Sequence, residues 1–247
     1  MKKMLSLILS LFGLACLFQP LFSQSNENLN QDNTKKKFTK EVICTIEVPY
    51  LLYLPKDYEE SSNKFPLLIF LHGSGERGTD LDKVKFHGPP KLISEGKEFP
   101  FIIVSPQCPE GRWWQISELN FLLDELIAEL KIDVNRIYLT GLSMGGYGTW
   151  AWAEYAPDRF AAIAPVCGGG NPLTISKIGK MPVWAFHGAK DLVVPVAESE
   201  RLINKLKIVN PDVKFTIYPE AGHDAWTETY NNPELYEWFL NQSLKSK

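Results

Sequence analysis

Cysteine and histidine are scarce in this sequence, with four of each among 247 residues. The cysteines are irregularly spaced, and the chain contains neither a CxxC pair nor an HExxH helix. These absences argue against a disulfide-rich scaffold and against a zinc site. We therefore expect no metal and no organic cofactor. Three cysteines, Cys44, Cys108 and Cys167, follow the N-terminal leader, and the sequence leaves any pairing among them open.

An excess of positive charge is also lacking, since 26 Lys and Arg stand against 29 Asp and Glu. A mildly acidic chain is not suited to hold polyanions, so we expect no nucleic-acid partner. The one basic run, Lys35 to Lys37 with Lys40, lies in residues 25–40. That stretch is rich in Asn, Gln and Lys and has too little apolar surface to fold, so we interpret it as a flexible linker.

Only the N-terminus carries a long apolar run. Lys2 and Lys3 precede the uncharged stretch 5–18, and small polar residues follow at 23–25. This pattern predicts a cleaved signal peptide at 1–24 and a secreted or periplasmic protein, since the run is short of the ~20 residues that span a bilayer. An uncleaved anchor is one alternative. Another is lipid attachment at Cys16, although Gly13 to Cys16 matches a lipobox poorly.

Residues 41–247 predict a single α/β domain, large enough to bury a core without disulfides or metals. Short apolar runs rich in Ile, Val, Leu and Phe alternate with longer amphipathic ones, as in strands buried on both faces of a parallel sheet. The expected strands are Cys44–Leu54, Pro66–Leu71, Phe101–Ser105, Arg136–Thr140, Ala161–Cys167, Pro182–His187 and Val213–Tyr218, and the expected helices are Ser117–Lys131, Ser143–Tyr155, Val196–Ile208 and Pro233–Leu244. A site in such a sheet lies at the carboxyl ends of the strands. The oligomeric state stays open.

A GxSxG pattern lies at Gly141 to Gly145, between an expected strand and an expected helix. This strand–turn–helix setting is the one that a nucleophile elbow requires. Side chains at positions 141 and 145 would collide with neighbouring backbone in so sharp a turn. The pattern predicts Ser143 as a nucleophile at the end of the sheet.

A serine nucleophile needs a general base, and the base needs a carboxylate to orient it. His223 follows the last expected strand on a short turn, from which an imidazole can reach the sheet edge. Asp191 is the acid in the loop after the preceding strand, and Asp224 is the alternative. The chain order Ser143, Asp191, His223 is the order of this sheet architecture. We interpret His72, His87 and His187 as structural or turn residues.

Acyl transfer also requires donors for the oxyanion of the transition state. The backbone N–H of Met144 is one candidate by its position after Ser143. The second should come from the glycine-rich loop that begins at His72, directly after an earlier strand. We predict the N–H of Ser74, with Gly75 as the next candidate.

Six motifs carry a resemblance to a known family, and they read, in chain order, HGSGERG, SPQCP, GLSMGGYGTW, CGGGN, HGAKDLVVP and GHDAW. Residues 45–245 resemble the secreted α/β-hydrolase esterases related to feruloyl and acetyl xylan esterases and to polyhydroxybutyrate depolymerases. The resemblance implies a mostly parallel central sheet flanked by helices, the triad Ser143, Asp191 and His223, and an oxyanion hole from the Gly73-Ser74 loop and Met144. No insertion long enough for a cap domain separates the motifs.

The substrate site is expected at the same end of the sheet, with Gln107, Trp114 and Trp226 as candidate contacts. An indole beside the triad suits a sugar ring or an aryl acid, whereas core packing is the alternative for the tryptophans. The expected activity is hydrolysis of small-molecule or polysaccharide esters through an acyl-enzyme, with acyl, acetyl or feruloyl esters of plant polysaccharides as substrates. The alternatives are a serine peptidase of the same fold and a surface protein that binds saccharides without catalysis.

Overall fold

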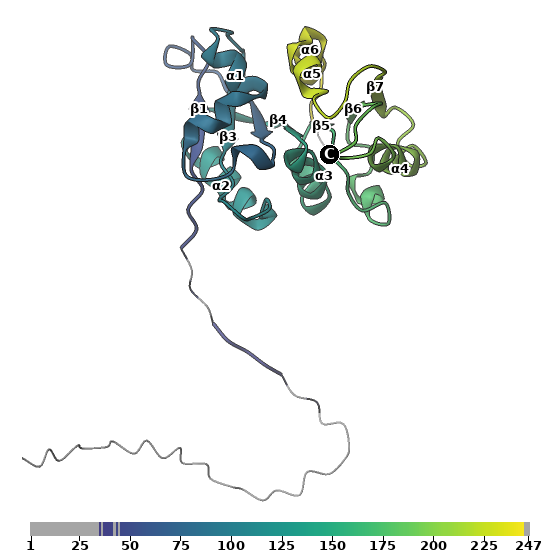
Figure 1. Ribbon diagram of the computed structural model, residues 1–247. Coiled ribbons are helices and arrows are strands. Elements are labelled where there is room, and N and C mark those ends of the chain that lie inside the picture. Colours follow the sequence, from purple (N-terminus) through teal and green to yellow (C-terminus); the bar gives the residue numbers. More distant parts are fainter. Residues whose placement is uncertain (1–34, 36, 42, 44, 245–247) are drawn as a thin grey trace, which may run out of the picture. The chain divides into compact units, whose positions relative to one another are not determined.

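The computed structural model describes residues 35, 37–41, 43 and 45–244 of the chain (Figure 1). The predicted signal peptide, Cys16 and Cys44 lie outside the described residues, as does most of the predicted linker. The chain divides into two units, residues 1–44 and 45–247. The described residues of the first unit are exposed and form neither helix nor strand. Within the described part of the chain, no helix is long and apolar enough to cross a membrane.

The second unit is built on a seven-stranded sheet with the order β1-β3-β2-β4-β5-β6-β7. The strands are β1 (Tyr50–Tyr53), β2 (Phe65–Leu71), β3 (Ile102–Pro106), β4 (Ile132–Leu142), β5 (Ala162–Val166), β6 (Trp184–Gly188) and β7 (Lys214–Tyr218). The edge strand β1 runs antiparallel to β3, with Tyr50 opposite Pro106, and the other pairs are parallel. The carboxyl ends of β2 to β7 therefore meet at one edge of the sheet.

Helices cover both faces of this sheet (Figure 1). Strand β2 shows the reason, because all seven of its residues are buried and successive side chains point to opposite faces. Leu67 and Ile69 pack in one core, and Leu68 and Phe70 in the other. The first core is closed by α2 (Ile116–Glu129), α3 (Met144–Tyr155) and α4 (Ala197–Leu206), and the second by α1 (Gly88–Ser94), α5 (Trp226–Asn231) and α6 (Pro233–Leu240).

The predicted fold class, a mostly parallel sheet flanked by helices, is confirmed. Each of the seven expected strands is present, although β1 is shorter than the run 44–54 and β4 begins before Arg136. Two helices were not expected, α1 and α5. The start of α1 is Gly88-Pro89-Pro90, which is typical of a turn, but proline is tolerated in the first turn of a helix, where its missing N–H has no partner.

Candidate active site

Ser143 lies at the junction between the end of β4 and the start of α3. Its backbone has φ 52° and ψ −116°, a conformation that costs a non-glycine residue about 1–3 kcal/mol. The Ser143 N–H donates to the carbonyl of Val166 on the neighbouring strand at 2.9 Å, which helps to hold the turn. The side chain thus leaves the sheet at the N-terminus of a twelve-residue helix, where negative charge is favoured.

The two flanking glycines let α3 approach the sheet closely. A Cβ on Gly141 would lie 2.7 Å from the carbonyl oxygen of Leu71 in β2. A Cβ on Gly145 would overlap that same oxygen and lie 2.7 Å from the carbonyl oxygen of His72. The expected collision of side chains with backbone at both positions is confirmed, and glycine is required there by space.

The structure brings Ser143, His223 and Asp191 into one chain of hydrogen bonds. Asp191 lies in the loop after β6 and His223 in the turn after β7, so both reach the edge where Ser143 lies. The Ser143 hydroxyl donates to His223 Nε2 at 2.9 Å, and His223 Nδ1–H donates to Asp191 Oδ2 at 2.7 Å. A single imidazole tautomer satisfies both bonds. Asp224 instead binds Thr227 through both carboxylate oxygens, so it turns away from this chain.

Asp191 is held as a carboxylate. Burial alone raises the pKa of this group, but hydrogen bonds from His223 and from the N–H groups of Val194 and Val193 outweigh burial, so the pKa lies below its ordinary value. Both amides donate to Oδ1 at 2.9 Å, whereas Oδ2 accepts from His223 Nδ1–H and lies 3.3 Å from His187 Nε2. The carboxylate is therefore fixed in the orientation that stabilises a protonated His223.

The other three histidines lie in different surroundings. His187 is buried and donates through Nε2 to the carbonyl of Val194, in the loop that carries Asp191. His72 is buried below the glycine-rich loop, where Nδ1–H donates to the Gly73 carbonyl and Nε2 accepts from the Cys108 N–H. Burial lowers the pKa of His72 to about 4, so its ring is neutral at physiological pH. His87 is partly exposed, with Nε2 3.6 Å from Glu76 Oε1.

The depressed pKa of His72 predicts a loss of stability in acid. The folded chain favours the neutral ring, so this contribution is complete above about pH 6.5 and is lost as the pH falls toward about 4. The expected loss from this group is about 3 kcal/mol in the free energy of unfolding. Urea denaturation across this pH range measures it. The pH dependence should be flatter in His72→Asn, and equal pH dependence in variant and wild type would contradict the assignment.

The glycine-rich loop passes directly beside Ser143. A Cβ on Gly73 would lie 3.7 Å from Ser143 Cβ, and Ser74, which is exposed, follows as the first residue of the 3₁₀ turn Ser74–Glu76. Arg77 Nε–H donates to the Ser74 carbonyl at 2.9 Å and fixes this turn. Met144 is the first residue of α3, so its N–H has no partner within the helix. The two predicted oxyanion donors, Ser74 and Met144, therefore lie in segments that flank the Ser143 side chain.

Gln107 was expected to contact substrate, and the structure corrects this expectation. Its side chain is 1% exposed and lies below the loop. The Gln107 Nε2 group donates to the carbonyls of Glu76 at 2.9 Å and Asp80 at 2.6 Å. Gln107 was predicted because it directly follows β3, at the edge of the sheet where site residues are expected. Its amide instead anchors the backbone of the loop.

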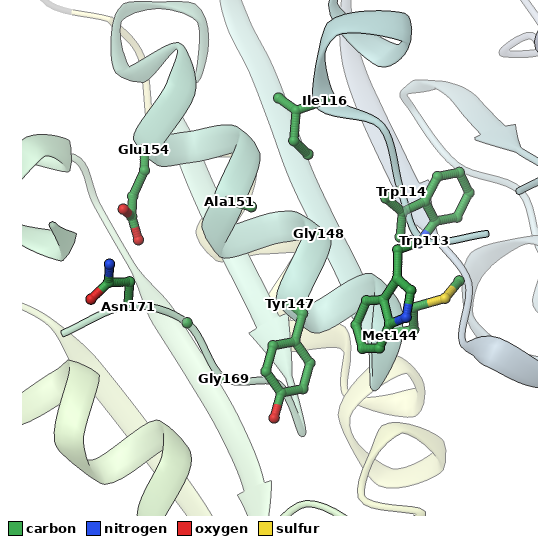
Figure 2. Close-up of a pocket in the computed structure, with 11 residues that line it drawn as sticks. Trp113, Trp114, Ile116, Met144, Tyr147, Gly148, Ala151, Glu154, Gly169 and Asn171 are labelled. Carbon is green, nitrogen blue, oxygen red and sulfur yellow. The ribbon is translucent and has the colours of Figure 1, made fainter. Parts of the chain in front are cut away.

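A pocket of about 330 Å³ lies along α3, beginning one residue after Ser143 (Figure 2). Trp113, Trp114 and Met144 lie on one side of it, and Glu154 and Asn171 lie on the other (Figure 2). Trp114 was predicted as a substrate contact and lines this pocket. Tyr147 was not predicted, although its spacing of four from Ser143 places it on the same stretch of helix.

Trp226 lies outside this pocket, against the catalytic histidine candidate. Its ring meets that of His223 edge to face, with centroids 5.0 Å apart, and that of His87 at 5.5 Å. The structure thus separates the two predicted tryptophans. Trp114 lies on the α3 side of Ser143, and Trp226 lies on the His223 side.

One group of side chains has the composition of a metal site. The ligand atoms of Cys167, Asp191 and His223 all lie within 4.8 Å of one another. Burial raises the pKa of the Cys167 thiol to about 12, however, so it is protonated at neutral pH, whereas a metal needs the thiolate. Asp191 and His223 already bind each other. We therefore interpret Cys167 as packing behind the hydrogen-bonded chain. Neither Cys167 nor Cys108 forms a disulfide within the described residues.

The known proteins that this chain is similar to include esterases, proteins named "Putative carboxymethylenebutenolidase" and, in fold alone, an acylaminoacyl peptidase. The family model described as dienelactone hydrolase family matches residues 117–237. The bifunctional acetylxylan esterase/xylanase XynS20E of Neocallimastix patriciarum is 29% identical over 164 residues, which cover 63% of this chain and 23% of that protein. A protein of Aspergillus terreus named "Probable feruloyl esterase C" is 28% identical over 168 residues, covering 63% and 59%.

The solved structures include a thermostable esterase that matches with a TM-score of 0.70 and 36% identity, covering 80% of this chain and 60% of that chain. The chain spans less than two thirds of the length of each of these three relatives. The similarity in structure and sequence, together with the sheet order and the elbow at Ser143, assigns the fold. The chain has the α/β-hydrolase fold, and it is similar to esterases.

Proposed function

We propose that this protein is a serine carboxylesterase. The observation that carries the proposal is the chain of hydrogen bonds from Ser143 through His223 to Asp191, with Ser143 on a strained turn. A serine with a purely structural role would need neither a positive φ nor a hydrogen bond to an imidazole that is itself bonded to a buried carboxylate. Strain of this kind persists where the surrounding structure enforces it, which is common at active sites.

The proposed reaction proceeds through an acyl-enzyme. His223 Nε2 takes the proton of the Ser143 hydroxyl as Oγ attacks the ester carbonyl carbon. The N–H groups of Ser74 and Met144 bind the oxyanion of the tetrahedral intermediate. His223 then gives its proton to the leaving alcohol, and the bond between carbon and alcohol oxygen breaks. Water, activated by the same imidazole, releases the acid and restores Ser143.

The proposed substrates are acetyl or hydroxycinnamoyl esters of plant polysaccharides, hydrolysed outside the cytoplasm after removal of residues 1–24. The pocket along α3 supports an acyl group, because it opens beside Met144 and is lined by the rings of Trp113, Trp114 and Tyr147. Aromatic side chains of this kind stack on an aryl acid. The names of the acetylxylan and feruloyl esterase relatives point to the same class of substrate. Export rests on the sequence of residues 1–24 alone.

The test is the rate of hydrolysis of methyl ferulate, p-nitrophenyl acetate and acetylated xylan by the protein without residues 1–24. We expect turnover of esters, with ester hydrolysis much faster than cleavage of a matched peptide p-nitroanilide. Amide cleavage as fast as ester cleavage would make the protein a peptidase. Saccharide binding without turnover of any ester would contradict an enzymatic role.

A further inference from the structure

His187 is a buried histidine that the proposed reaction does not use. It is the fourth residue of β6, and its side chain is fully buried. Successive side chains of a strand point to opposite faces, so His187 lies on the same face as Ala185, which packs in the core that α4 closes. A buried polar group is costly unless it is hydrogen-bonded, so the partners of the two ring nitrogens show what this histidine holds in place.

Both ring nitrogens of His187 have hydrogen-bond partners. Nε2 lies 2.8 Å from the Val194 carbonyl, which can only accept, so this nitrogen carries a proton. On the other side of the ring, Nδ1 lies 2.8 Å from the hydroxyl of Ser199 in α4, and that hydroxyl is 2.9 Å from the Gly168 carbonyl. The imidazole is therefore held between α4 and the loop that follows β6.

The loop that His187 holds is the one that carries Asp191. The backbone of Val194 is bonded on both sides, because its carbonyl accepts from His187 and its N–H donates to Asp191 Oδ1 at 2.9 Å. The Val193 N–H donates to the same oxygen at 2.9 Å. His187 therefore fixes Oδ1 indirectly, through the backbone that binds this oxygen.

His187 also lies directly beside the other carboxylate oxygen. Its Nε2 is 3.3 Å from Asp191 Oδ2, and the side chains of both residues are fully buried. The partial positive charge of the Nε2–H group is thus next to the oxygen that accepts from His223 Nδ1–H at 2.7 Å. Solvent screens such a buried contact only weakly, so it favours a carboxylate that stays charged and keeps its place.

We propose that His187 is a positioning residue of the active site, which holds the Asp191 carboxylate in line with His223. This inference rests on the proposed function. Asp191 must keep Oδ2 on His223 Nδ1–H while the imidazole takes the proton of Ser143, since a rotated carboxylate would release the ring and stabilise its positive charge less. His187 is fully buried, so it acts on the reaction through Asp191 and Val194 and not by contact with substrate.

The test compares two replacements of His187. His187→Leu keeps an apolar side chain in the space and removes both ring nitrogens, whereas His187→Gln keeps an N–H donor that can reach the Val194 carbonyl. Ser199→Ala is a milder variant that removes only the partner of Nδ1. The matched control is Asn210→Ala, because Asn210 is also buried and donates to the Met181 carbonyl at 2.7 Å, but it lies before β7, at the opposite edge of the sheet. Thermal melting shows whether each variant is folded.

We expect His187→Leu to lower kcat on p-nitrophenyl acetate about 10²-fold with little change in KM, because a misplaced carboxylate affects the chemical step and not substrate binding. His187→Gln should recover most of the loss, and Ser199→Ala should lower kcat by a smaller factor. Asn210→Ala should lower the melting temperature without changing kcat. The proposal is overturned by an unchanged kcat in folded His187→Leu, or in folded Ser199→Ala where His187→Leu does not fold. An equal loss of kcat in Asn210→Ala would also overturn it.

Proton NMR tests the same contact without any substrate. The His223 Nδ1–H proton lies in a short, charge-assisted hydrogen bond and should give a downfield signal that is absent from His223→Ala. We expect this signal to persist in Asn210→Ala and to shift upfield or broaden in His187→Leu, and an unchanged signal in His187→Leu would overturn the positioning role. Failure of the wild-type protein to hydrolyse any ester would overturn the proposed function, and the NMR signal would then still decide whether His187 positions Asp191.

Discussion

Replacement of Ser143 by alanine should lower kcat/KM on p-nitrophenyl acetate by about 10⁴-fold or more, with little change in stability. Ser143 Oγ is the atom that would form the acyl-enzyme, and its hydroxyl contacts His223 at the surface of the site. The change removes the nucleophile and leaves the helix and sheet packed. Steady-state kinetics measure the loss, and thermal melting supplies the control for folding.

The same experiment with His223→Ala and the double variant tests whether the residues act as a unit. Each single replacement breaks the same chain of hydrogen bonds, so the double variant should be little worse than either one. Losses that multiply in the double variant would show that Ser143 and His223 contribute independently. That result would contradict the proposed proton transfer from the Ser143 hydroxyl to His223.

Replacement of Gly145 by alanine should have the largest effect on stability. The new methyl group would overlap the Leu71 carbonyl in β2, so α3 and the sheet would have to separate. Overpacking in a rigid core costs about 3 kcal/mol or more, against a typical gain from alanine in a helix of about 1 kcal/mol. Urea denaturation of the purified variant measures the difference in the free energy of unfolding.

Gly75→Ala is the matched control for this prediction. A Cβ on Gly75 would meet no atom of the described residues within 4 Å, and its φ is not in the left-handed region. Its free energy of unfolding should stay within about 1 kcal/mol of the wild-type value. Equal destabilisation by the two changes would mean that the close approach of α3 to β2 is not what requires glycine at position 145.

The strands were predictable because burial on both faces gives them nearly continuous apolar runs. Strand β2 is the clearest example, since it is buried throughout and alternates between two cores. The helix α1 was not predictable in the same way. Its first residue, Gly88, has φ +67°, and a Cβ there would lie 2.6 Å from Phe70 Cζ. Tertiary packing, which a sequence pattern does not contain, selects the helix at this point.

The residues of the candidate site were likewise predictable only in part. Ser143, Asp191 and His223 were found from chain order and from their places after strands, and the structure puts their side chains in contact, while their catalytic roles stay predictions. Gln107 also follows a strand, but its amide turned out to bind the loop backbone. Tyr147 was missed as a pocket residue because its contact with the ring of Trp113, from a distant part of the sequence, appears only in three dimensions.

The central claim is that Ser143 is an activated nucleophile, and covalent labelling tests it most directly. The protein is treated with a fluorophosphonate and analysed by mass spectrometry, in parallel with Ser143→Ala. The account predicts one adduct on the wild-type chain, located at Ser143, loss of ester hydrolysis in proportion to labelling, and no adduct on the variant. An unlabelled wild-type protein, or an adduct at another residue that abolishes activity, would contradict it.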